Sequence, residues 1–283
     1  MFPNSTHRKR FAIFYLICFA VYYGWYCYHG LLLHQLAPVF FHNKLDITSN
    51  IIQLSDLFNI VIRTQWLQIL FDTLFLLLPL LLCVCCVAGY RVQYLLAITA
   101  AIFNLVYAVL LSSMSALSME GFVGWMMLPI VLAFRNEASF YYALQSMRYF
   151  FLLIFFSAAI WKIRTGAIFN TEQMSSILVN QHAACLVDQP DSWFSNFIKY
   201  LINHKQLSYS IYLLATLSEF VFVVGFFTKR FDKLLIIIFL AFVGLDYFLM
   251  SINYFSWTAF LVCLWFSKYA RPAEERSEQV LTA

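Results

Sequence analysis

Long apolar runs alternate with short polar segments along most of this 283-residue chain. A helix rises about 1.5 Å per residue, so about 20 apolar residues cross a hydrocarbon core of roughly 30 Å. Six runs are long enough, at about 11–30, 66–89, 92–115, 148–167, 208–227 and 232–250. Two shorter runs, at about 120–134 and 252–267, bring the predicted total to eight. The pattern predicts an all-α integral membrane protein, a polytopic bundle of about eight transmembrane helices.

Two longer connections, at about 31–65 and 168–207, separate these runs. In the second, Pro190, Asp191 and Ser192 are typical of a helix start, with Asp191 or Ser192 as the cap. Apolar residues then recur at helical spacing, namely Trp193, Phe194, Phe197, Ile198 and Leu201. This segment predicts an interfacial helix, lying on the membrane surface or covering one end of the bundle. Residues 48–62 predict a similar, less regular helix.

The composition agrees with lipid as the main solvent. Apolar residues make up 63% of the chain and charged residues 11%, whereas a soluble domain carries about a quarter charged residues. The net charge of +4 is small and spread along the chain, and no basic run is interleaved with aromatics that could hold a phosphate backbone, so nucleic acid is not expected as a partner. The lipid bilayer is the expected partner.

The positive charges predict an orientation. With the N-terminus inside, cytoplasmic segments hold twelve Lys and Arg residues and outer segments hold six, mostly in the two long loops. Both termini are therefore expected in the cytoplasm, and the membrane is expected to be a bacterial inner membrane. Residues 1–270 are predicted to form a single transmembrane domain, followed by a short polar cytoplasmic tail at 271–283.

Four ionisable residues fall inside apolar runs, where an unpaired charge costs several kcal/mol. They are Asp72, Lys162, Glu219 and Asp246. Lys162 lies 14 residues beyond Arg148, and Asp246 lies 14 residues beyond Asp232, so both are expected about 21 Å from the inner face. Glu219 is expected near mid-membrane. These charges can converge only if their helices line one cavity.

Three interpretations of Lys162 remain open at this point. It could neutralise a carboxylate and fix helix packing, or it could extend its stem to the headgroups. It could also serve as a base or nucleophile, because removal from water favours the free amine, although nearby carboxylates favour the ammonium. We therefore take Lys162, Glu219 and Asp246 as the candidate catalytic residues. The histidines lie outside the spans at spacings that predict no metal site.

Two segments resemble the HTTM family, the horizontally transferred transmembrane domain that also forms the membrane part of vitamin K-dependent gamma-carboxylase. Residues 149–163 resemble its aromatic and aliphatic run that ends in small residues and a lysine, here Lys162. Residues 213–222 resemble its glutamate-bearing helix, here Glu219, which a basic turn follows. Asp246 stands where family members often carry a histidine.

The resemblance implies a lysine base at the outer side, since in the carboxylase this lysine starts vitamin K hydroquinone oxygenation. The cofactor would then be a quinone and the activity carboxylase- or oxidoreductase-like, with Glu219 and Asp246 tuning Lys162. A cavity lined by aromatics such as Tyr149, Tyr247 and Trp257 would accompany it. The DoxX/MauE-like group, small bundles that serve redox pathways, resembles the chain less closely because its members are shorter.

Two further functions remain as alternatives. The chain could be a non-catalytic partner or assembly protein of another envelope component, acting through its outer loops. It could also be a transporter with Asp72, Glu219 and Asp246 as a proton relay, which would predict matching halves with broken helices. No internal repeat is evident in the sequence.

Overall fold

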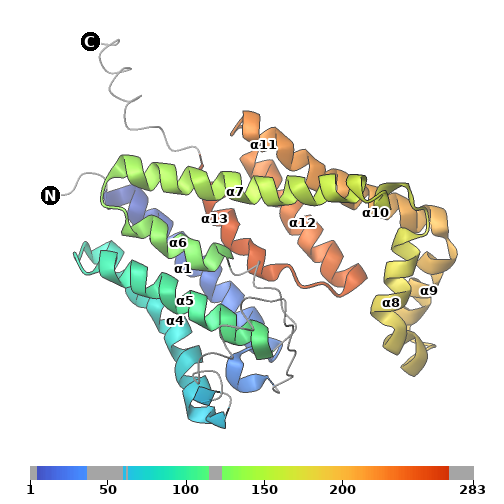
Figure 1. Ribbon diagram of the computed structural model, residues 1–283, viewed down its shortest axis with the longest axis horizontal. Coiled ribbons are helices and arrows are strands. Elements are labelled where there is room, and N and C mark those ends of the chain that lie inside the picture. The colour runs from blue at the N-terminus through green and yellow to red at the C-terminus, as the bar shows by residue number, and fades with distance from the viewer. Residues whose placement is uncertain (1–4, 37–59, 62, 115–122, 268–283) are drawn as a thin grey trace. The chain divides into compact units, whose positions relative to one another are not determined.

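The computed structural model describes residues 5–36, 60–61, 63–114 and 123–267 (Figure 1). Throughout these residues the secondary structure is helical, with no strand. The helices, in chain order, are α1 (Ser5–Tyr28), η1 (Leu33–Gln35), α4 (Gln65–Ala88), α5 (Gln93–Met114), α6 (Val123–Ala133), α7 (Glu137–Arg164), η3 (Ala167–Phe169), α8 (Gln173–Asp188), α9 (Trp193–Asn203), α10 (Lys205–Phe220), η4 (Val221–Val223), α11 (Val224–Phe227), α12 (Asp232–Met250), η5 (Phe255–Phe260) and α13 (Leu261–Trp265). The predicted all-α class is confirmed.

Six helical segments in the described part are long and apolar enough to cross a membrane. They are Thr6–Gln35, Gln65–Ala88, Gln93–Ser112, Glu137–Arg164, Lys205–Phe227 and Asp232–Met250. Each corresponds to one of the six long runs predicted from the sequence. The two shorter runs form helices at Val123–Ala133 and Phe255–Trp265, which are below the length of a full crossing. The total of eight crossings therefore stays a prediction.

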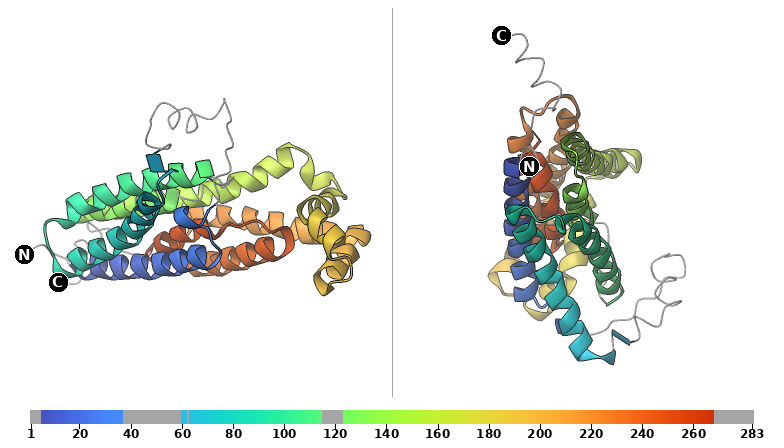
Figure 2. Two further views of the ribbon diagram at one scale, coloured as in Figure 1. Left: turned by 90° about the horizontal axis from the view of Figure 1, so that it is seen from below. Right: turned by 90° about the vertical axis from the view of Figure 1, so that its left-hand side faces the viewer.

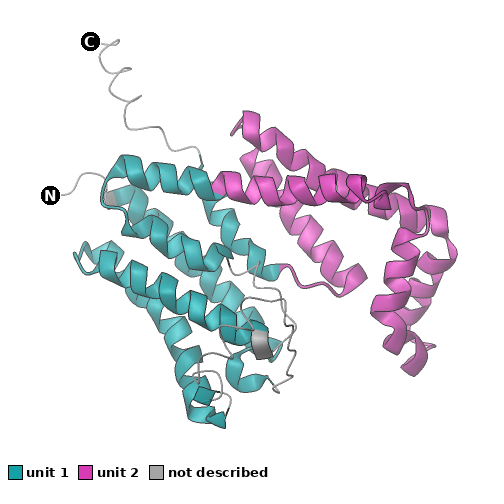
Figure 3. Cartoon of the chain, viewed as in Figure 1, with its two compact units in different colours: residues 1–147, 255–283 teal, residues 148–254 magenta. Residues whose placement is uncertain are grey.

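The chain divides into two compact units (Figure 3). Unit 1 comprises residues 1–147 and 255–283, and unit 2 comprises residues 148–254. The boundary at Met147 falls within α7, so this helix begins in unit 1 and ends in unit 2. Apart from residues 271–283, both units lie within the span of residues 1–270 that the sequence predicted as one domain. The predicted tail at 271–283 lies outside the described residues.

Unit 1 is built around aromatic side chains. Helix α4 packs against both α1 and α5, and α6 packs on α5 (Figure 2). Between them the rings of Phe75 and Tyr107 stack at 3.9 Å, and Phe19 meets Trp125 edge-on at 5.4 Å. All four side chains are fully buried. Lipid tails are as apolar as these rings, so close van der Waals packing holds the helices together here.

A close backbone approach joins the two short helical segments of unit 1. A Cβ atom placed on Gly124 of α6 would lie 2.6 Å from Cβ of Ala259 and 2.9 Å from Cε2 of Phe260 in η5. Only glycine leaves room for this contact. The tight packing explains how these short apolar helices find a fixed place in the unit.

Unit 2 contains the predicted helix in the second long connection, and one more. Helix α9 begins where predicted, and Oγ of Ser192 caps it by accepting a hydrogen bond from the amide of Ser195 at 3.1 Å. The preceding helix α8 was not predicted, because its polar and apolar residues follow no clear periodicity. Residues 48–59 and 62 of the other predicted loop helix lie outside the described residues.

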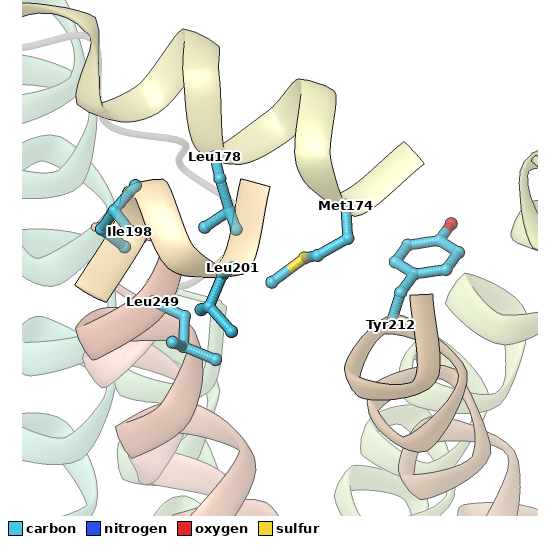
Figure 4. Packing of buried hydrophobic residues seen from close by; sticks show 6 residues of the cluster. All are labelled: Met174, Leu178, Ile198, Leu201, Tyr212 and Leu249. Carbon is cyan, nitrogen blue, oxygen red and sulfur yellow. The ribbon is translucent and has the colours of Figure 1, made fainter. Parts of the chain in front are cut away.

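Helices α8 and α9 share a small core with α10 and α12 (Figure 4). Its buried members are Met174, Leu178, Ile198, Leu201, Tyr212 and Leu249. The buried His182 of α8 adds a polar contact, with Nε2 at 2.7 Å from the carbonyl oxygen of Leu249. The sequence predicted only that His182 lies outside the long apolar runs, and its burial was not predicted. A buried ring nitrogen needs a partner, and the end of α12 supplies one.

Candidate functional site

Lys162 and Glu219 form a direct ion pair within unit 2. The Lys162 ammonium Nζ donates to both Oε1 and Oε2 of Glu219, each at 2.8 Å. The Glu219 side chain is 6% exposed and the Lys162 side chain 25%. The ammonium therefore points to a buried carboxylate, while part of the side chain stays accessible. This geometry does not favour a lysine extended to the headgroups on its own.

Both residues lie where their helices change geometry. Lys162 is in the last turn of α7, and Gly166 ends that helix in the left-handed conformation at φ 75°. Glu219 is in the last turn of α10, after which Val221–Val223 form a 3₁₀ turn before α11. A 3₁₀ stretch inside a longer helical segment often marks a functional or strained site. The change in winding follows Glu219 within a single candidate span, Lys205–Phe227.

A second ion pair fixes the register of α7 against α12. Arg148 donates from Nε to Oδ2 of Asp232 at 2.8 Å and from Nη2 to Oδ1 at 2.6 Å. The same Nη2 donates to the carbonyl oxygen of Gly225 at 2.7 Å. Both charged side chains are buried, at 0% and 1% exposed. Arg148 is one of the twelve positive charges that the sequence places on the inner side. The structure shows that its side chain is enclosed between helices, and the side of the membrane on which it lies stays a prediction.

The Arg148–Asp232 pair places Lys162 and Asp246 at one level. Lys162 lies 14 residues after Arg148 on α7, and Asp246 lies 14 residues after Asp232 on α12. The two helices run in the same direction from the ion pair. At 1.5 Å per residue, each is about 21 Å along its helix. Asp246 is buried at 4% exposed and interacts electrostatically with Lys162 and Glu219. In the described residues, its carboxylate belongs to no ion pair within 4.0 Å.

Tyr212 is a member of the site that the sequence analysis did not identify. The Lys162 ammonium lies 5.5 Å from the centroid of its ring, a cation–π contact. Tyr212 precedes Glu219 by seven residues, two helical turns, so both side chains occupy one face of α10. That spacing could have identified Tyr212. Of the aromatic residues proposed to line a cavity, Tyr149 stacks on Phe226 with ring centroids 5.9 Å apart.

Asp72 has partners of its own in unit 1. Its carboxylate accepts hydrogen bonds from the amides of Leu33 and His34, at 3.1 and 3.0 Å, and from the Tyr107 hydroxyl at 2.6 Å. Nδ1 of His34 lies 2.6 Å from Oδ2. These contacts fasten the η1 turn to α4. A carboxylate with this many donors is stabilised as a packing element.

An exposed ion pair outside the site provides a comparison for the buried one. Lys205 and Glu172 form an exposed ion pair at 2.5 Å, and the Lys205 ammonium lowers the pKa of the Glu172 carboxyl. It serves below as a control for the buried lysine pair. Within the described ranges, no three His, Cys, Asp or Glu side chains lie close enough to hold a metal ion.

The length and apolarity of the six helices define the chain as a multi-pass integral membrane protein. No family model matches its sequence. No curated protein and no solved structure matches it either.

Proposed function

We propose that unit 2 holds a proton-handling site for a quinone or a similar lipid-soluble cofactor, with Lys162 as the central group. The observation that carries this proposal is the Lys162–Glu219 pair, with both N–O distances at 2.8 Å, at the level of the buried Asp246. A charged pair is costly to bury in lipid, and intramembrane ionisable residues are retained for function more often than elsewhere.

The residues of the site fit a quinone. A lysine ammonium has three N–H donors, and Glu219 takes two of them, which leaves one for a ligand oxygen. The Lys162 side chain is 25% exposed, so a ligand can approach it. Tyr212 adds an aromatic face beside the ammonium. A quinone supplies two-electron redox chemistry and carbonyl oxygens that accept hydrogen bonds.

The proposed role of each residue follows from its position. Lys162 binds and orients a ligand oxygen and holds a proton at Nζ. Glu219 exchanges a proton with Nζ along a contact of 2.8 Å, which converts an ion pair into a neutral amine and acid. Asp246, close to both charges, biases this exchange. The neutral amine is the form of Lys162 that acts as a base.

The resemblance of residues 149–163 and 213–222 to the HTTM family supports the same assignment. In that family the lysine and the glutamate stand on separate helices of one membrane domain. We propose that the chain is a member, with a carboxylase- or oxidoreductase-like activity. Asp246 then replaces a family histidine as the third ionisable group.

A binding experiment tests the proposal directly. The purified protein in lipid nanodiscs is titrated with menadione, and quenching of tryptophan fluorescence is recorded. We expect saturable quenching, and a Lys162→Met variant should bind about tenfold more weakly because it loses a charge-assisted hydrogen bond.

The control variant is Lys205→Met, which removes the same charge from the exposed pair with Glu172 and should leave binding unchanged. Equal binding by the wild type and both variants would remove the support for a quinone site. A loss that is equal in both variants would point to a general effect of charge.

A second function is favoured by the exposed aromatic and aliphatic side chains around α8 and α9. Trp193, Val187 and Phe169 are 71%, 76% and 74% exposed. A non-catalytic partner or assembly protein of an envelope component would use such residues. If this is the function, a deletion strain that carries the Trp193→Ala variant keeps the deletion phenotype, whereas the Lys162→Ala variant restores the wild-type phenotype.

The remaining alternatives have less support. A proton relay through Asp72 would have to displace donors that already hold its carboxylate, from Leu33, His34 and Tyr107. The DoxX/MauE-like interpretation shares the lysine near a helix end, here Lys162 in the last turn of α7. The redox role expected of that group is tested by the same menadione titration.

For localisation, we propose a bacterial inner membrane with both termini in the cytoplasm. The distribution of positive charge, twelve Lys and Arg on one side and six on the other, supports this orientation. The outer side would then carry the α8–α9 segment and the Lys162 end of α7.

A further inference from the structure

A groove on unit 1 lies beside the start of the first transmembrane helix. Its volume is about 380 Å³, and its lining residues are Arg10, Ile13, Phe14, Ile17, Trp265 and Phe266. The first four stand at positions i, i+3, i+4 and i+7 of α1, so they form one stripe on that helix. The other two come from the end of α13. The volume lies in the range of small-molecule sites.

The lining of the groove is mostly aromatic and aliphatic. The ring of Phe14 stacks on Trp265 with centroids 5.5 Å apart and an interplanar angle of 14°. Phe266 meets Phe14 edge-on at 5.7 Å. Ile13, Ile17 and Trp265 are 44%, 54% and 48% exposed. On a membrane-spanning helix, such an exposed apolar surface faces acyl chains.

One end of the groove carries a positive charge without a protein partner. Arg10 is exposed, and the described residues contain no hydrogen bond or ion pair to its guanidinium. Its neighbour Arg8 differs, because it donates to the carbonyl oxygen of Phe134 and to the Tyr94 hydroxyl. Arg8 is thus used inside unit 1, while Arg10 remains available to a ligand.

The stripe on α1 has a charged end and an apolar end, as a phospholipid does. Ile17 lies about 10 Å along α1 from Arg10, at 1.5 Å per residue, so the charge and the apolar part are separated along the helix axis. Arg10 precedes the apolar run and is placed at the level of lipid headgroups, where tryptophans such as Trp265 also concentrate. A guanidinium binds a phosphate through two parallel hydrogen bonds.

We infer that this groove is a binding site for an anionic phospholipid, with the phosphate on Arg10 and an acyl chain along Ile13, Ile17 and the Phe14–Trp265 stack. Charge complementarity selects an anionic over a zwitterionic lipid, since the headgroup ammonium of the latter repels the guanidinium. One basic residue near anionic lipid is worth roughly a fivefold preference.

Quenching of Trp265 by brominated lipids tests the inference. The protein is placed in nanodiscs of equal parts phosphatidylglycerol and phosphatidylcholine, with bromine on the acyl chains of only one lipid at a time. Trp265 emission is the difference between the wild type and Trp265→Phe, which keeps an aromatic ring in the stack. We expect brominated phosphatidylglycerol to occupy the groove about fivefold more often than brominated phosphatidylcholine.

Arg10→Gln should bring the two lipids to equal quenching, and Arg10→Lys should retain a preference for phosphatidylglycerol. The control is Arg91→Gln, an exposed arginine in the turn between α4 and α5, which should keep the full preference. Equal quenching by both lipids in the wild type overturns the inference. So does a loss of preference in Arg91→Gln that matches the loss in Arg10→Gln.

Absence of Trp265 quenching by either lipid also overturns the inference, because it means that protein fills the groove. Removal of residues 268–283, which follow the groove directly in sequence, then identifies that occupant. In this case quenching emerges only in the shortened chain.

Discussion

At the scale of single residues, the two ion pairs of unit 2 differ in how far their cations are enclosed. Arg148 is enclosed and binds both oxygens of Asp232 as well as the carbonyl oxygen of Gly225. Lys162 binds both oxygens of Glu219 but remains a quarter exposed. The first pair is enclosed and forms a fixed joint between α7 and α12, whereas the lysine of the second pair stays partly accessible, as the proposed ligand site requires.

Removal of the first pair's cation should be strongly destabilising. Arg148→Ala leaves the buried Asp232 carboxylate without its partner, and we expect the unfolding free energy to fall by about 3–5 kcal/mol. Unfolding in mixed detergent micelles measures this change. Lys205→Ala, which breaks the exposed pair with Glu172, should cause no measurable change. Equal stability of Arg148→Ala and wild type would contradict the assigned role.

The second pair allows packing and function to be separated. Lys162→Met should destabilise the protein by up to about 3 kcal/mol, because Glu219 is left buried and unpaired. The double variant Lys162→Met/Glu219→Met should recover most of that loss, since apolar pairs of similar volume replace buried ion pairs at little cost. Menadione binding should stay lost in both variants. A double variant that binds menadione normally would leave the pair with a packing role only.

The sequence predicted part of the site and could not predict the rest. Lys162, Glu219 and Asp246 stand out because charges are rare in apolar runs. The partner of Lys162 could not be chosen from the sequence, since both carboxylates were expected within reach. Arg148 and Asp232 are each the first residue of an apolar run, and charges at such positions are typically solvated in a loop. Only the packing of α7 against α12 reveals that they are buried.

At the scale of helices, the lengths of the apolar runs predicted which segments form helices long enough to cross a membrane, but predicted less well where these helices begin. Helix α7 starts at Glu137, ahead of the predicted start at residue 148. Its first turns contain Gln145, which is buried and donates to the carbonyl oxygen of Ser267 at 3.1 Å. A polar side chain that finds a hydrogen-bond acceptor inside the protein does not interrupt a helix, yet it lowers the local hydropathy.

The contact between α6 and η5 gives a prediction at the same scale. Gly124→Ala would bring a methyl group to 2.6 Å from Cβ of Ala259, which cannot move without the backbone. We expect a loss of about 1–3 kcal/mol in unfolding free energy. Gly244→Ala on α12 is the matched control, because no atom lies within 4 Å of its added Cβ. This control should be neutral or stabilising by up to about 1 kcal/mol. Equal effects of the two changes would contradict the tight contact.

At the scale of the whole molecule, the proposed orientation can be tested with reporter fusions. Alkaline phosphatase is active outside the inner membrane, and green fluorescent protein is fluorescent inside it. With both termini in the cytoplasm, a fusion after Ala283 should fluoresce and lack phosphatase activity. A phosphatase fusion after Asn170, beyond the Lys162 end of α7, should be active. The reverse result at either site would exclude the proposed topology.

The Arg148–Asp232 joint has a consequence for how this protein can change over evolution. The register of Lys162 and Asp246 depends on two equal chain lengths counted from that joint. One inserted residue in either length would turn the distal side chain by about 100° and raise it by 1.5 Å. We therefore expect exchanges among apolar side chains in both stretches to be better tolerated than insertions or deletions there. Among related sequences, the spacing of 14 residues from Arg148 to Lys162 and from Asp232 to Asp246 should therefore vary less than the residues within each stretch.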